Sequence, residues 1–157
     1  MFDFILFRPV LRPAGYGIEY FSAEALPKDV FASSADLEKA RAIVKKAKYF
    51  HFQIYSAEQG FVKLMKEHGC TLVVALSDFF GVEPREAARR LGAARVLVRI
   101  AQKEGVRVRI FSLARNGNEL RDEYEIFWIG KLLGISDDEL LAGKNEAANW
   151  QQKGAAE

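Results

Sequence analysis

The basic side chains of residues 85–121 have the type and spacing that most clearly indicate a chemistry, which is the binding of anions. This segment holds ten Lys and Arg against three Glu, a net charge of +7, whereas residues 1–84 sum to 0 and residues 122–157 to −5. The whole chain has a net charge of only +2, so an acidic C-terminal part hides a basic middle. Such a block of like charge predicts a polyanionic partner, although it does not bear on the fold.

Five of these basic residues are expected to form one stripe along a helix. At about 100° per residue, the segment 84–104 places its apolar side chains on one arc and most basic side chains on the opposite arc. The basic arc consists of Arg85, Arg89, Arg95, Arg99 and Lys103. Only Glu86 and Glu104 flank it, and no ladder of i, i+4 acid–base pairs runs along it. Because unpaired cations repel one another and guanidinium matches phosphate geometry, we expect this arc to bind phosphate groups; a solvated charged face is the alternative.

Two apolar residues, Val96 and Ile100, lie among these charges. Their side chains gain nothing from contact with water, so we expect them to mark the edge of a contact with a partner protein. Scattered apolar side chains are also common on protein surfaces, and that alternative stays open.

Residues suited to bond-breaking chemistry are few and isolated. Neither His51 nor His68 belongs to a metal-binding motif such as H-x-H or H-E-x-x-H, and we expect His51 to be hydrogen-bonded within a strand. The single cysteine, Cys70, precedes an apolar run and is expected to pack in the core. Asp78 follows that run, where α/β enzymes place catalytic carboxylates. We expect Asp78 to cap the next helix, with a catalytic role as the alternative.

Length and composition predict one globular domain. The chain has 157 residues, of which 50% are hydrophobic and 28% charged. No apolar run reaches the ~20 residues that a membrane span needs, and we expect the N-terminal MFDFILFRP to be a strand rather than a signal peptide. One cysteine predicts a reducing compartment, so we expect a cytoplasmic protein. Residues 1–148 are expected to form a single α/β domain, followed by a frayed polar tail at 149–157.

Short β-rich runs alternate with helical ones along the chain. Strands are predicted at 2–7, 30–32, 49–55, 71–77 and 107–112, and helices within 33–49, 56–70, 83–105, 123–133 and 137–148. The proline-rich segment 8–29 is expected to be an irregular connection. Strands separated by helices form βαβ units and predict a mainly parallel sheet. Since a full TIM barrel needs eight such units and ~250 residues, we expect either an open sheet or a shortened, incomplete TIM-barrel-like fold.

Several helix boundaries have local signals. Ser34 or Asp36 is expected to cap the first of these helices, and Ser56 the second. Pro84 is expected in the first turn of the long helix, and Gly105 at its end. The nearly continuous apolar run 71–77 predicts a strand that helices cover on both faces.

The order of motifs over residues 64–145 resembles the C-terminal half of ribonuclease P protein component 3, an archaeal and eukaryotic family related to the PHP phosphoesterases. The pieces are TLVVALSDFF, the Arg- and Ala-rich helix with VRVRIFS, NELRDEYEIFWIGKLLGIS and DDELLAGKN. Residues that match the family pattern directly are Glu119, Leu120, Arg121, Gly130, Leu133 and Gly134. Glu125 and Ile126 stand where the family has an acid and Leu, whereas Glu123 replaces the expected proline.

The resemblance implies a PHP-like TIM-barrel fold and a non-catalytic subunit of ribonuclease P. In that family the RNA removes the 5′ leader of precursor tRNA, using Mg²⁺, and the protein pairs with protein component 2. It also implies ribonuclease P RNA as a partner, and allows two copies of this chain within a hetero-tetramer. No cofactor is expected to bind the protein directly. The alternatives are a small α/β metal-dependent phosphoesterase or hydrolase and a protein-only interaction module.

The polar segment ARNGNELRDEYE, residues 114–125, is then expected to join a strand to a helix. Arg115 and Arg121 would reach phosphate or a partner, Asn116-Gly117 would supply the turn, and Glu119 or Asp122 would cap the next helix. The alternative is an ordinary loop whose arginines pair with its own glutamates.

Overall fold

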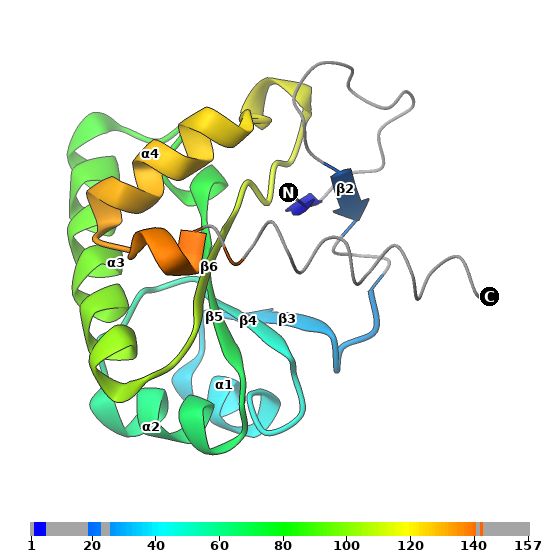
Figure 1. Cartoon of the computed structure of the whole chain (residues 1–157), viewed down its shortest axis with the longest axis vertical. Coiled ribbons are helices and arrows are strands. Elements are labelled where there is room, and N and C mark those ends of the chain that lie inside the picture. The colour runs from blue at the N-terminus through cyan, green and yellow to red at the C-terminus, as the bar shows by residue number, and fades with distance from the viewer. Residues whose placement is uncertain (1, 6–18, 23–25, 141, 143–157) are drawn as a thin grey trace.

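The computed structural model describes residues 2–5, 19–22, 26–140 and 142, and its main body is a parallel sheet alternating with helices (Figure 1). The strands of this sheet are β3 (Phe31–Ser34), β4 (Tyr49–Phe52), β5 (Thr71–Ala75) and β6 (Val108–Phe111). The helices are α1 (Leu37–Ile43), α2 (Gln59–Glu67), α3 (Pro84–Glu104) and α4 (Glu123–Leu133). Residues 137–140 are also helical, while the rest of the predicted helix 137–148 and the tail 149–157 are almost wholly outside the described residues.

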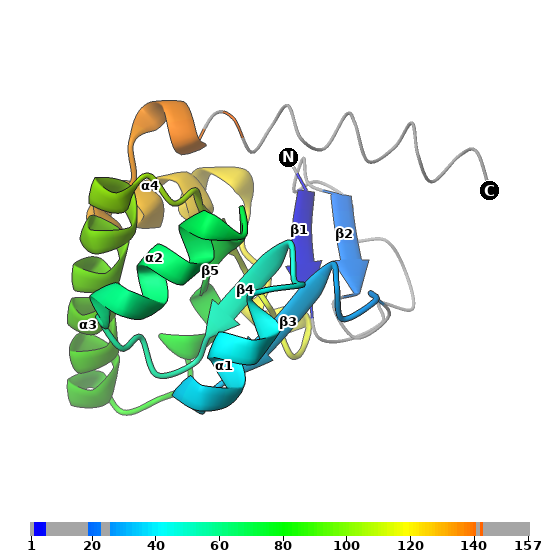
Figure 2. The same ribbon diagram turned by 90° about the horizontal axis from the view of Figure 1, so that it is seen from below.

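The four strands follow one another across the sheet in the order β3-β4-β5-β6, and every neighbouring pair is parallel. Crossovers between parallel strands are right-handed. A chain whose strands always advance in one direction across the sheet therefore places all its crossover helices on one face of that sheet. Figures 1 and 2 show α1, α2 and α3 on the same side of the sheet. This winding is the one found in barrels, and it confirms the predicted class: repeated βαβ units in a shortened, incomplete TIM-barrel-like fold.

The two faces of the sheet have separate apolar cores. The core on the helical side joins strand residues such as Leu72 to Phe61 of α2, Leu97 of α3 and Ile126 of α4. The core on the other face contains no residue of the four helices. It consists of Phe31, Tyr49, Val73, Ala75, Phe111 and Leu113, with Leu26 and Val30 packed against them. The described helices cover only one face of β5, and none of their residues belongs to the core on its second face, so the described part of the chain does not confirm the expectation that helices cover both faces.

A separate two-stranded parallel sheet is formed by β1 (Phe2–Ile5) and β2 (Glu19–Ser22). It lies on the side of the main sheet that the helices leave open (Figure 2). Its strand β1 is in contact with β6. The expectation of an irregular segment over 8–29 is wrong at 19–22, because the prolines of that segment flank these four residues rather than interrupt them.

Most of the expected boundary signals operate as predicted. Asp36 caps α1, its Oδ1 accepting the backbone N–H groups of residues 38 and 39 at 2.9 and 3.0 Å. Pro84 is the first residue of α3, and Gly105 ends it with a φ of 79°. Ser56 is not the cap of α2, since the helix begins one residue after Glu58, which makes no capping bond through its side chain. None of the described helices is long and apolar enough to cross a membrane.

Candidate functional site

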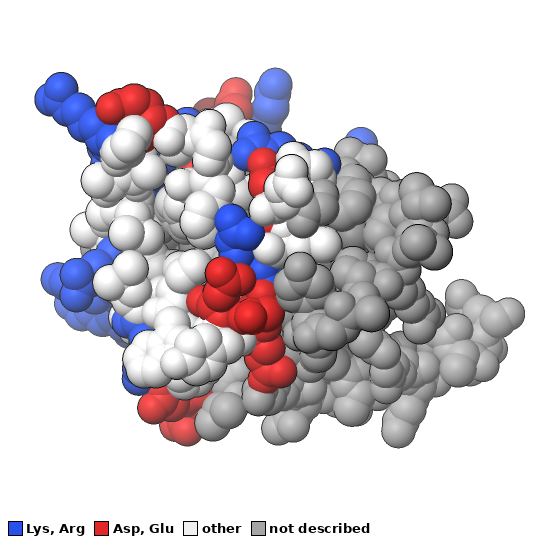
Figure 3. Space-filling model, turned by 90° about the horizontal axis from the view of Figure 1, so that it is seen from above, with Lys and Arg blue, Asp and Glu red and all other residues white. Residues whose placement is uncertain are grey.

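The exposed face of α3 carries the predicted basic stripe. Its opposite face is buried through Ala94, Leu97, Val98 and Ala101. All five residues of the stripe are exposed: Arg85, Arg89, Arg95, Arg99 and Lys103. Figure 3 shows basic side chains at the margin of the molecule where α3 lies in Figure 1. The stripe predicted from helical periodicity therefore exists as one solvent-facing row.

Within the described residues, the side chains of this row form hydrogen-bonded ion pairs only at the first turn of the helix. Arg89 donates two hydrogen bonds to Glu86, from Nε at 2.8 Å and from NH2 at 2.7 Å, and Arg90 donates from Nε at 2.8 Å. The hydrogen bonds from Arg89 and then Arg90 lower the pKa of Glu86 to about 2. Arg95 and Arg99, by contrast, make no hydrogen bond or ion pair within the described part of the chain. Two turns of the helix thus present unneutralised guanidinium groups.

The two apolar residues of the stripe differ in burial. Val96 is 47% exposed, between Arg95 and Arg99, whereas Ile100 packs partly against the core on the helical side. Val96 is therefore the side chain of this pair that a partner would reach, and the role of both in a protein contact stays a prediction.

Arg115 closes the loop after β6 onto the end of β5. Its backbone N–H and its Nε donate to Glu119 Oε2 at 2.8 and 3.1 Å, and its NH2 donates to the carbonyl oxygen of Ser77 at 3.0 Å. Burial opposes ionisation of Glu119, but the hydrogen bonds from Arg115 outweigh it and lower the pKa of the carboxyl. Asn116 forms the expected turn, accepting the N–H of Asn118 at 3.0 Å. The intramolecular Arg–Glu pair of the alternative interpretation is present, and an RNA contact by Arg115 stays a prediction.

Arg121 also makes contacts within the loop. Its NH1 donates to the carbonyl oxygens of Asn118 and Leu120 at 3.1 and 2.7 Å, and its guanidinium carbon lies 4.1 Å from the centre of the Phe80 ring. The next residue, Asp122, caps α4 and forms a capping box with Glu125, as one of the two expected caps. These contacts hold the Arg121 charge at the entry to α4, and its role in RNA binding is likewise a prediction.

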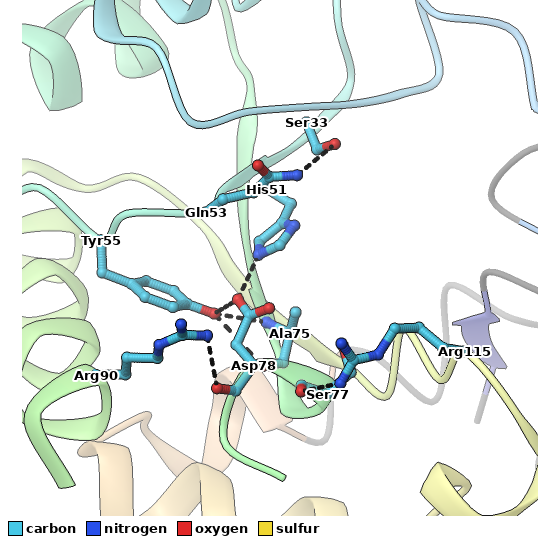
Figure 4. Close-up of polar contacts among 9 residues, drawn as sticks. All are labelled: Ser33, His51, Gln53, Tyr55, Ala75, Ser77, Asp78, Arg90 and Arg115. Atoms are coloured by element: carbon cyan, nitrogen blue, oxygen red, sulfur yellow. Dashed lines mark hydrogen bonds and ion pairs between the residues drawn. The ribbon is translucent and has the colours of Figure 1, made fainter. Parts of the chain in front are cut away.

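A buried polar cluster lies at the carboxyl ends of β4 and β5 (Figure 4). Asp78 Oδ2 lies 2.8 Å from His51 Nε2 and accepts the Tyr55 hydroxyl at 2.8 Å. Tyr55 in turn accepts the backbone N–H of Ala75 at 3.0 Å, and Arg90 NH1 donates to the carbonyl oxygen of Asp78 at 3.2 Å. The expectation of a hydrogen-bonded His51 is confirmed. The expectation that Asp78 caps the following helix is wrong, because that helix starts at residue 84 and the aspartate side chain turns inward.

Tyr55 was not predicted to belong to this cluster. The only local signal is a tyrosine just after a strand, at the sheet edge where Asp78 also lies. Its left-handed backbone, with φ at 48°, aims the ring across the strand ends, and this could not be read from residue type. The cluster fixes the short 3₁₀ turn Leu76–Asp78, which leads from β5 toward α3. No group of three metal-ligating side chains occurs among the described residues.

The comparisons with known proteins bear only on the fold. No family model and no curated protein matches the chain. A crystal structure of an uncharacterized protein is similar, with a TM-score of 0.52 and 20% sequence identity over 71% of this chain and 30% of that chain. This chain therefore spans less than a third of that structure, and a likeness at this level of identity shows a shared fold and nothing about activity.

Proposed function

We propose that the chain is a non-catalytic, RNA-binding protein subunit of ribonuclease P that supports the catalytic RNA during removal of the 5′ leader of precursor tRNA. The observation that carries this proposal is the row of exposed arginines on α3, of which Arg95 and Arg99 have no intramolecular partner in the described residues. The motif resemblance over residues 64–145 and the barrel-type winding support the choice of ribonuclease P among RNA-binding assemblies.

The length of the row suits a polynucleotide. From Arg85 to Arg99 the helix advances about 21 Å, a length over which one strand of double-stranded DNA carries about six phosphates. A helix packed along one face is a rigid support, so its charges do not need to be ordered when RNA binds. In this proposal Mg²⁺ serves the RNA, while the protein supplies positive charge and position.

Protein component 2 is the proposed protein partner, with Val96 and Ile100 at the edge of the contact. The exposure of Val96 amid unpaired arginines favours a surface that serves RNA and protein together. A purely protein-binding module would need Val96 for its contact but not the charges beside it.

The test is the double variant Arg95→Glu with Arg99→Glu, measured by fluorescence anisotropy with ribonuclease P RNA over a series of salt concentrations. Loss of two phosphate contacts should weaken binding and make the slope of log affinity against log salt shallower by about 1.4–1.8. The matched control is Lys45→Glu with Lys46→Glu, two exposed lysines beyond the end of α1 that change the net charge equally. Equal effects of the two double variants would contradict a role for the α3 row.

A further inference from the structure

The outer face of α4 exposes large apolar side chains at successive turns. Tyr124 is 70% exposed, Trp128 52% and Leu132 57%. These are three of the five exposed large apolar residues in the described part of the chain. The burial of Ile126, Gly130 and Leu133 holds the helix against the body of the domain, so this outer row is fixed in place.

Two of these side chains border an open groove beside the loop that precedes α3. The groove has a volume of about 730 Å³ and is lined by Phe80, Arg121, Tyr124, Glu125, Trp128 and Ile129. Figure 3, which looks down on this side of the molecule, shows an uncharged surface with charged groups near it. The volume is within the range of small-molecule sites, so the groove is large enough for the base and sugar of a nucleotide.

The aromatic groups of the groove are arranged to hold a flat ligand. The rings of Tyr124 and Trp128 meet edge to face at 5.9 Å and 70°, so a ring stacked on one has its edge against the other. The guanidinium group of Arg121 lies over the ring of Phe80, and both residues also line the groove. The one acidic group, Glu125, accepts the backbone N–H of Asp122 in the capping box, so it is engaged in helix capping.

From this geometry we propose that the α4 groove binds an unpaired base of single-stranded RNA, stacked on Trp128 with its edge against Tyr124 and with its backbone toward Arg121. This proposal rests on the proposed function, since it assigns a second RNA contact to an RNA-binding chain. Phe80 lies four residues before α3, so Arg121 stacked on it joins the groove to the end of α3 where Arg85 begins the basic row. A strand leaving that row would meet aromatic faces there, and stacking on aromatic side chains is how proteins bind unpaired bases with little sequence preference.

The experiment uses the full chain with Trp150→Phe, which leaves Trp128 as the only tryptophan of the original two. A single-stranded oligoadenylate RNA of about 12 nucleotides should quench the fluorescence of Trp128, and an RNA duplex of the same length should not. In the same background, fluorescence anisotropy of labelled oligoadenylate should show binding weakened by between about 5-fold and about 150-fold in Trp128→Ala, while Trp128→Phe should retain most of the affinity.

The control is Leu132→Ala, which removes exposed apolar surface one turn farther along the same face. Base stacking requires Trp128 and not Leu132, whereas a partner helix lying along α4 would use both. Unchanged oligoadenylate affinity in Trp128→Ala, or an equal loss in Leu132→Ala, would overturn the proposal. If Arg95→Glu with Arg99→Glu still weakens RNA binding in that case, the proposed function stands without the groove; if neither variant has an effect, both proposals fall.

Discussion

Replacing Tyr55 with Phe removes the hydroxyl group that contacts the end of β5 and the turn after it. We expect this to lower the free energy of unfolding by about 2–4 kcal/mol. The strand β4 pairs with β5 only as far as His51 opposite Val73. Beyond that point the hydroxyl of Tyr55 takes the place of a strand partner, accepting the N–H of Ala75 at 3.0 Å. In Tyr55→Phe that buried N–H group has no acceptor, which costs about 1–3 kcal/mol.

The same substitution removes a donor from Asp78. Its carboxylate loses the 2.8 Å bond from the hydroxyl but keeps His51 and is 19% exposed. Bonds to charged groups contribute about 1.5–3 kcal/mol, and the remaining access of Asp78 to water lowers the loss of this bond to about 1 kcal/mol. The two contributions together give the expected range.

The assay is urea unfolding of the full chain, with Tyr124→Phe as the control. Tyr124 is 70% exposed, and its hydroxyl makes no hydrogen bond within the described residues, so the same chemical change there should alter stability by less than about 0.5 kcal/mol. If Tyr55→Phe destabilises the protein no more than Tyr124→Phe does, the cluster does not hold the turn and the reasoning fails.

The pH dependence supplies an independent check. Burial, and then the charge of Asp78, raise the pKa of Tyr55 well above its usual value of about 10. The folded state favours the neutral phenol of Tyr55. Its contribution to stability is therefore complete below about pH 10 and is lost as the pH rises above the pKa that Tyr55 has in the unfolded chain. The stability difference between the wild type and Tyr55→Phe should therefore shrink above about pH 10.

The remaining predictions concern α3 and α4. An NMR titration should place the pKa of Glu86 near 2, and Arg89→Ala should raise it, because the hydrogen bonds from Arg89 are the largest cause of the lowering. Gly92→Ala should stabilise the protein by about 0.5–1 kcal/mol in urea unfolding, since an added Cβ would meet no atom within 4 Å. Gly130→Ala should destabilise the protein in the same assay, because the added Cβ would lie 2.5 Å from Leu140 Cδ2. A less stable Gly92→Ala or a more stable Gly130→Ala would contradict the packing of these two glycines.

The elements of this fold that could be predicted are those with local signals. Helix α3 combines a proline at its start, a glycine at its end and a 3.6-residue apolar period, and its bounds match the expectation. The strand β5 has a continuous apolar run, and Asp36 is a residue type that caps helices. In each case the physical cause lies within a few residues of its effect.

The features that were not predicted depend on residues that are distant in the sequence. The apolar run of β5 indicates that both faces are buried but not which elements lie against them. On the second face, Val73 and Ala75 share a core with Tyr49 and Phe111 of the two neighbouring strands. Likewise, Asp78 has the residue type of a cap, but its partners His51 and Tyr55 are 27 and 23 residues away, and only the parallel pairing of β4 with β5 brings them together.

The arginines of the described residues differ in whether a counter-charge lies beside them. At the carboxyl edge of the sheet, Arg90 and Arg115 donate to the carbonyl oxygens of Asp78 and Ser77, and each also pairs with a glutamate. Glu119 balances the charge of Arg115, and Arg90 shares Glu86 with Arg89, so both arginines stabilise turns and add less to the potential outside the molecule than an arginine without a counter-charge. On the outer face of α3, Arg95 has no such counter-charge among the described residues. A polyanion approaching this part of the chain would therefore be attracted to the outside of the helical layer rather than to the strand ends, where α/β enzymes hold their substrates.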